Sequence, residues 1–225
     1  TLDRSSAASD VYKRQGYYWV TSYGTDSTHS IEVRRHRGTE AWEAAPGEYY
    51  HQSTGELGGL WRFRGRPPQQ LVGVGFTSQG FDTSNPYRKS EESKDPRVSF
   101  IMEGVNEGEE FGDYGLVQGG AGGFEIDRAD IELGTPPHAL VLATTDGFSD
   151  VYQHVIEEVL LNDGLQGGTV NPLVRGDMVY YEGPNNGAVF STGSISWCGS
   201  LSHNNYDNDV SKITNNVLKR FVSEE

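Results

Sequence analysis

The chain has 225 residues, of which 32 are acidic and 18 basic, so its formal net charge at neutral pH is −14. This charge repels polyanions over a Debye length of about 8 to 10 Å, which disfavours nucleic acid and anionic membranes as partners. Because no apolar stretch approaches the roughly 20 residues of a membrane helix and a single cysteine excludes an internal disulfide, we expect a cytoplasmic protein.

The first segment, residues 1–15, is polar, lacks a sustained apolar period and does not begin with Met. Residues 5–15 resemble translated adapter sequence of the kind found in metagenomic reading frames. We therefore predict that 1–15 is a disordered tail foreign to the biological protein, with an ordinary flexible tail as the alternative. Residues 16–225 then form one domain fragment that is truncated at its N-terminus.

Several strands are predicted in the first half of this domain. Residues 16–23 are aromatic and β-branched, residues 30–35 alternate apolar with polar side chains, and the run 71–76 has the composition of a buried strand. The polar, proline-bounded residues 80–96 read as a surface loop, after which a strand is expected over 97–102. The 29 glycines of the chain predict a loop-rich fold.

The second half is expected to contain a buried strand at 139–144 and a strand at 155–161, although the latter also fits a helix. Residues 177–182 and 188–197 both have strand character, and the PNNG sequence between them favours a turn. The sequence therefore predicts a hairpin, which is followed by a polar loop.

A helix is predicted after residue 209. Val210, Ile213, Val217 and Phe221 recur at helical spacing, and Asp209 is suited to be the N-cap. Basic side chains follow near the expected C-terminal end, where their positive charge interacts favourably with the helix dipole. The hairpin and this helix are the clearest predicted elements of the chain.

Glu125 is the first candidate for chemistry, because it follows the glycine-rich sequence GGAGGF. Glycines let backbone amides or a ligand approach closely, so an acid/base role for this carboxylate is plausible. No helix signal and no Lys-Ser/Thr pair follows, which argues against a nucleotide-binding loop. A surface turn before a solvated strand is the structural alternative.

His51 is the second candidate, since Tyr50 and the carboxylates of Glu48 and Glu56 are close to it in the sequence. Such a set can bind iron or act in general acid/base catalysis. The spacing matches no metal-ligand motif, so aromatic packing around a satisfied histidine is the alternative.

Weaker candidates lie near the end of the chain. Ser194 and Cys198 fit no nucleophile-elbow pattern, which favours structural roles for both. The loop 202–209 is rich in hydrogen-bonding side chains, and its residues His203 and Asn204 are candidates to line a substrate pocket. Helix capping and loop chemistry are the alternatives for this segment.

Several of these segments together resemble the C-terminal domain of the large (beta) subunit of the N,N-dimethylformamidase family. They occur in one order over most of the chain, at 16–19, 31–35, 41–62, 65–82, 119–130 and 187–221. A long ordered match of this kind is more specific than any single short motif above.

The resemblance implies a Rossmann-like, amidotransferase-like α/β layered sheet and an iron-dependent amidohydrolase that cleaves a small N-substituted formamide to formate and an amine. It also implies that the iron ligands are two tyrosines and the glutamate of a His-Pro-Glu-Tyr-Trp-type motif. That motif is absent from this sequence. The chain is therefore expected to bind no metal itself and to be inactive alone. Its expected partners are the missing N-terminal part of the same polypeptide, a small subunit and further copies of itself.

In this interpretation Glu125 handles protons at the second wall of the pocket, while His51 has a lower-ranked catalytic role beside Tyr50. A competing hypothesis is a non-catalytic module that binds carbohydrate or a partner protein. It would use Trp42, Trp61 and Tyr87 as aromatic stacking platforms.

Overall fold

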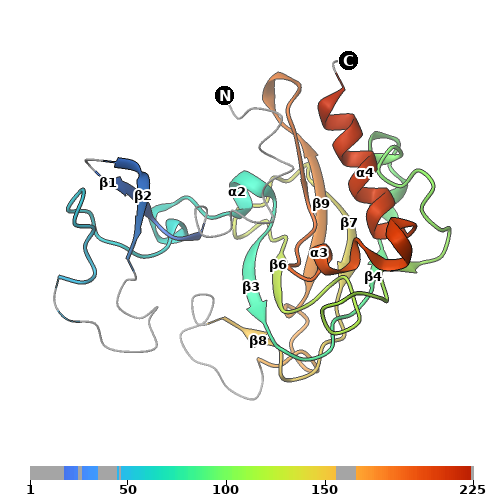
Figure 1. Ribbon diagram of the computed structural model, residues 1–225, viewed down its shortest axis with the longest axis horizontal. Helices are drawn as coiled ribbons and strands as arrows, with labels where there is room; N and C mark the ends of the chain where they lie inside the picture. The colour runs from blue at the N-terminus through green and yellow to red at the C-terminus, as the bar shows by residue number, and fades with distance from the viewer. Residues whose placement is uncertain (1–17, 25–26, 35–44, 46, 156–165, 224–225) are drawn as a thin grey trace.

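A computed structural model describes residues 18–24, 27–34, 45, 47–155 and 166–223 of the chain. Three earlier expectations lie outside these residues: the 1–15 tail, Trp42, and all but the first residue of the 155–161 strand. In the described part, ten strands form three antiparallel sheets (Figure 1). No described helix is long and apolar enough to cross a membrane.

A five-stranded sheet forms the centre of the molecule, in the order β10-β9-β7-β4-β5. The strands are β4 (Tyr87–Lys89), β5 (Glu110–Phe111), β7 (Leu140–Thr145), β9 (Gly176–Glu182) and β10 (Ala188–Ser191). The first six residues of β9 are buried, since both of its faces are covered. Its side chains Met178 and Tyr180 join the main core, whereas Val179 packs into a smaller cluster on the opposite face.

Helix α4 (Asp209–Val222) covers one face of this sheet (Figure 1). The predicted stripe is confirmed, because Val210, Ile213 and Val217 are buried in the core and Phe221 packs against it. The N-cap is Asn208, whose side-chain oxygen accepts a hydrogen bond from the Ser211 N–H, and not Asp209. Asp209 is instead the first helical residue, where its negative charge interacts favourably with the helix dipole.

A three-stranded sheet, β6-β3-β8, lies beside the central one. It consists of β3 (Gly75–Gln79), β6 (Glu125–Arg128) and β8 (Gln153–His154). A two-stranded hairpin of β1 (Thr21–Gly24) and β2 (Ser27–Val33) projects to one side of the body, together with the segment 47–65 (Figure 1). We refer to this projecting part as the N-terminal lobe.

The remaining helices are short. They are η2 (Trp61–Arg64), α2 (Gln69–Val72), η3 (Glu91–Lys94), η4 (Pro96–Val98), η5 (Pro184–Asn186), α3 (Trp197–Ser200) and η6 (His203–Tyr206). Each spans one turn, so these helices act as connections between strands and cover little of any sheet face.

The expected Rossmann-like, amidotransferase-like α/β layered fold is wrong for the described residues. Such a fold requires parallel strands joined by crossover helices. Here every strand pair is antiparallel, and α4 is the one described helix longer than four residues. The fold is β-rich.

Three local predictions also fail. The expected strand 71–76 is a short helix up to residue 72, and β3 begins only at residue 75. The expected loop 80–96 contains β4, which lies inside the central sheet. The expected strand 97–102 begins as the 3₁₀ helix η4, where Pro96 occupies the first turn. The hairpin of β9 and β10 is confirmed, with the PNNG residues at its turn.

Candidate functional site

The glycine-rich segment before β6 passes very close to its neighbours. A Cβ on Gly120 would come within 2.5 Å of the Ser84 backbone, and one on Gly122 within 2.3 Å of the Thr145 hydroxyl oxygen. Phe124, the next residue but one, has a φ of 63°, which is unusual for a bulky side chain. The glycines therefore allow the backbone to pack closely against Ser84 and Thr145 just before β6 begins.

Two serines that follow β10 hold this segment in place. The Gly123 N–H donates to the Ser194 Oγ at 2.8 Å, and the Ser194 hydroxyl donates back to the Gly123 carbonyl at 3.0 Å. The Ser196 N–H also donates to the Ser194 Oγ, at 3.1 Å, and the Ser196 hydroxyl lies 3.2 Å from that of Ser84. The Ser194 hydroxyl thus bonds the backbone that leads into Glu125.

Glu125 begins β6 and is half-buried. It pairs with the exposed Gln79 of β3, and its carbonyl accepts a hydrogen bond from the Ile195 N–H at 3.2 Å. The strand alternates in burial, so Glu125 lies on the opposite face from the fully buried Ile126. This places the carboxylate at the border between the protein interior and its surface.

Two exposed apolar residues are linked to Glu125 through its backbone neighbours. The Phe81 ring contacts the Phe124 ring edge-on at a centroid distance of 5.2 Å, yet Phe81 is 67% exposed. Ile195, which is bonded to the Glu125 carbonyl, is 45% exposed. We call the set Phe81, Phe124, Glu125 and Ile195 the Glu125 face. Exposed apolar groups around one carboxylate are typical of a surface that another part of a protein covers.

A carboxylate in this setting can perform acid/base chemistry. General acid/base catalysis needs a side chain within hydrogen-bond reach of the proton that moves, and Asp and Glu are among the residues that serve. Glu125 is therefore the acid/base candidate of this segment, at a half-buried position.

His51 lies elsewhere, in the N-terminal lobe. It is 1% exposed, and its Nδ1 lies 2.5 Å from the Oγ of the buried Ser22. The Ser22 hydroxyl is also 2.7 Å from that of Ser53, which donates to Glu32 at 3.0 Å. The His51 Nε2 is buried and has no hydrogen-bond partner among the described residues. The sequence did not reveal this cluster, because its members come from segments that are distant along the chain.

The other lining candidates are separated from Glu125 by their elements. Tyr50 is half-exposed in the N-terminal lobe and bridges to Leu57. His203 and Asn204 belong to η6, next to α4, where the His203 ring stacks on Tyr114 with centroids 4.1 Å apart. Asn204 has a φ of 49° and donates its side-chain amide to the Asp207 carbonyl. The predicted catalytic and pocket residues thus occupy three parts of the fold.

The aromatic platforms of the binding-module hypothesis are not presented as one surface. Tyr87 is completely buried, and its hydroxyl donates to the Thr192 carbonyl at 2.7 Å. Trp61 is half-buried, with the Arg66 guanidinium 5.7 Å from its ring centroid. Tyr87 is therefore a core residue and cannot stack on a ligand.

The resemblance implies an iron site built from two tyrosines and the glutamate of a His-Pro-Glu-Tyr-Trp-type motif, and that motif is absent from the sequence. Within the described ranges, no group of three or more His, Cys, Asp or Glu side chains is placed to hold a metal ion.

Comparison with known proteins gives a consistent match. The family model described as "N,N-dimethylformamidase beta subunit-like, C-terminal" matches residues 15–208. The chain is 46% identical over 211 residues to the N,N-dimethylformamidase beta subunits of Paracoccus aminophilus and of an Alcaligenes species. Each match covers 93% of the chain and 28% of the relative, so the chain spans about a quarter of these subunits. The chain belongs to the family of the C-terminal region of N,N-dimethylformamidase beta subunits.

Proposed function

We propose that the chain acts as the C-terminal part of a dimethylformamidase-like beta subunit that hydrolyses a small N-substituted formamide. The identity of 46% with the two beta subunits over almost the whole chain is the observation that carries this proposal. In the reaction, water adds to the formyl carbon, the C–N bond breaks, and formate and a protonated amine are released. A group that moves a proton between the water and the leaving amine is needed.

Glu125 has this proton-transfer role in the proposal. Support comes from its half-buried position and from the exposed apolar residues linked to it, Phe81 through the ring of Phe124 and Ile195 through its N–H. A preceding part of the same polypeptide would cover this face and complete the pocket. His51 is buried in the N-terminal lobe and lies within hydrogen-bond distance of Ser22, so in this proposal it supports that lobe.

The iron implied by the family resemblance would, in this proposal, be held by residues outside the described part of the chain. The purified 225-residue chain is then expected to contain no stoichiometric iron and to show no formamidase activity. Elemental analysis and an assay of formate release measure both properties. Formamidase activity of the chain alone would contradict the proposal.

A chimera gives the positive test. The matching 28% of the Paracoccus aminophilus beta subunit is replaced by this chain, and the hydrolysis of N,N-dimethylformamide is followed by formate release. We expect an active enzyme. A chimera that assembles and binds iron normally but has no activity would show that the chain does not perform this function.

Glu125→Gln in the active chimera tests the catalytic carboxylate. Loss of a general acid/base typically lowers turnover by about 10² to 10⁴-fold, whereas the iron content should not change. Glu132→Gln is the matched control, because Glu132 is an exposed glutamate shortly after β6 and outside the Glu125 face. If Glu125→Gln retains full turnover, Glu125 has no role in proton transfer.

A further inference from the structure

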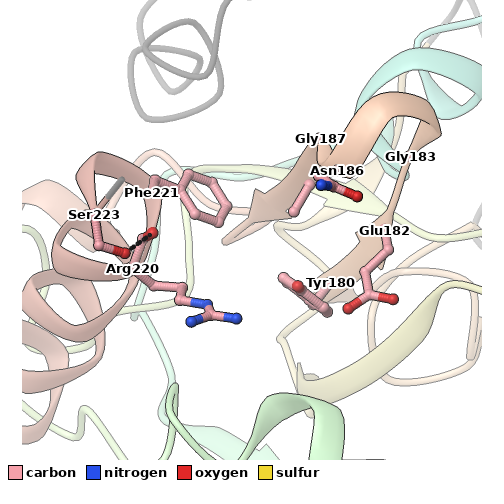
Figure 2. A pocket seen from close by; sticks show the side chains of 9 residues that line it. Tyr180, Glu182, Gly183, Asn186, Gly187, Arg220, Phe221 and Ser223 are labelled. Atoms are coloured by element: carbon pink, nitrogen blue, oxygen red, sulfur yellow. Dashed lines mark hydrogen bonds between the residues drawn. The ribbon is translucent and has the colours of Figure 1, made fainter. Parts of the chain in front are cut away.

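A cavity of about 350 Å³ opens between the β9–β10 hairpin and the last turn of α4 (Figure 2). Tyr180 and Glu182 of β9 line one side, Asn186 lies at the turn, and Arg220 and Phe221 of α4 line the other side. A volume of this order is typical of sites for small molecules, which usually measure about 300 to 1,000 Å³. The cavity lies outside the Glu125 face, so it has no part in the function proposed above.

The cavity contains a cation and an anion that are not paired. Neither Arg220 nor Glu182 forms an ion pair with another described residue, and Figure 2 shows them on opposite sides of the Tyr180 ring. Arg97, a second basic residue near Tyr180, is already bonded to Asp95 at 2.7 Å. The Arg220 guanidinium lies 5.7 Å from the centroid of the Phe100 ring, a contact that leaves its hydrogen-bond donors available.

Tyr180 adds a hydrogen-bond donor between these charges. Its burial raises the pKa of the phenol, the Glu182 carboxylate raises it further, and Arg220 opposes the shift. The phenol therefore stays protonated at neutral pH, and it interacts with the Glu182 carboxylate that lines the same cavity. Together with the Asn186 amide, it provides polar contacts around the space that faces Arg220.

We propose that this cavity binds a small zwitterion of the amino-acid class, with the ligand carboxylate at Arg220 and its ammonium group at Glu182. A simple anion would be attracted by Arg220 but repelled by Glu182, and a simple cation would meet the reverse arrangement. A molecule that carries both charges can pair with Arg220 and with Glu182 at the same time. The Phe221 ring and Ala188 line the same space and would contact an apolar side chain of the ligand.

Calorimetric titration of the 225-residue chain tests the proposal with glycine, L-leucine and L-phenylalanine as probes. Two analogues of leucine each lack one charge: 4-methylpentanoate has no ammonium group, and 3-methylbutylamine has no carboxylate. We expect at least one of the amino acids to bind. Where leucine binds, each analogue should bind at least about tenfold more weakly, since it leaves one charged wall unsatisfied.

Arg220→Gln and Glu182→Gln should each weaken amino-acid binding by at least about tenfold. Lys219→Gln is the matched control, because it removes a positive charge from the neighbouring, exposed position, which does not line the cavity. This control should bind as the unmodified chain does. Thermal unfolding of all three variants checks that the exposed substitutions leave the fold intact.

Three results would overturn the proposal. The first is no binding of any of the three amino acids up to about 10 mM, where even a weak site is occupied. The second is equal binding of leucine and its single-charge analogues, which excludes recognition of a zwitterion. The third is unchanged binding in both Arg220→Gln and Glu182→Gln, which places the ligand elsewhere. None of these results depends on formamidase activity, so the function proposed for the Glu125 face is tested separately.

Discussion

Ser194 bonds both backbone groups of Gly123, although the two residues are 71 positions apart in the sequence. Its hydroxyl accepts from the Gly123 N–H and donates to the Gly123 carbonyl. A single side chain thus forms the hydrogen bonds that the backbone of a neighbouring strand would otherwise form. The strand that carries Glu125 begins two residues later. The position of the Glu125 carboxylate therefore depends on a serine that follows a different hairpin.

Ser194→Ala should lower the free energy of unfolding by about 1 to 3 kcal/mol, because it leaves buried backbone groups without partners. Chemical denaturation followed by tryptophan fluorescence measures this change. Ser99→Ala is the control, since Ser99 is exposed and bonds only a local carbonyl. Equal stability of the two variants would show that the Ser194 bonds contribute nothing.

Gly122→Ala tests the close packing of the glycine-rich segment. The added methyl group would lie 2.3 Å from the Thr145 hydroxyl oxygen, so Thr145 or the segment must move. Overpacking of this kind typically costs about 1 to 3 kcal/mol. The control is Gly183→Ala, where the nearest atom would be 3.7 Å away. A midpoint of denaturation unchanged from the unmodified chain would mean that the segment has room to relax.

Asn208→Ala removes the N-cap of α4. The Asn208 side chain accepts from the Ser211 N–H at 2.9 Å and donates to the carbonyls of Leu201 and His203. We expect a loss of about 2 kcal/mol, at the upper end for caps, because the residue is buried and several bonds are lost together. Asn215→Ala, at an exposed position in the same helix, should change the stability by less than about 0.5 kcal/mol. A similar effect of both substitutions would contradict the cap.

Glu32 gives the N-terminal lobe a pH-dependent stability. Hydrogen bonds from the Gln52 N–H, from Arg34 and from Ser53 lower the pKa of its carboxyl from 4.5 to about 2. Since the folded-state value is the lower one, this stabilisation is complete above pH 4.5 and is lost as the pH falls towards 2.

Thermal unfolding from neutral to acidic pH tests the role of Glu32. The difference in Tm between the unmodified chain and Glu32→Gln should be largest at neutral pH and should shrink under acid. Glu56→Gln changes an exposed carboxylate in the same lobe and should show no such trend. A constant Tm difference for Glu32→Gln at all pH values would rule out the linkage.

The parts of the fold that could be predicted are those with a local cause. The α4 stripe and the β9–β10 hairpin follow from residues a few positions apart, and both are confirmed. Strand β4 could not be found in this way, because its three residues lie in a polar segment and become a strand only through pairing with β5 and β7. Tyr87 is buried for the same reason.

The candidate site was predictable in part. The glycines marked the entry to Glu125, since close backbone contact needs residues without side chains. Its link to Ile195 was not visible, because the Ile195 N–H reaches the Glu125 carbonyl only through the return of the chain after β10. Ser22 and His51 are in contact in the N-terminal lobe, but they are 29 positions apart in the sequence, so no local pattern indicates this contact.

The two larger sheets are also joined to each other. The Ala129 N–H, just after β6, donates to the buried Asp177 of β9 at 2.9 Å, and the Asp127 N–H donates to the Gly193 carbonyl at 2.9 Å. The strand that carries Glu125 therefore cannot separate without breaking bonds to the central sheet. Its amide protons should exchange with solvent as slowly as those of β9, in a single cooperative opening of both sheets.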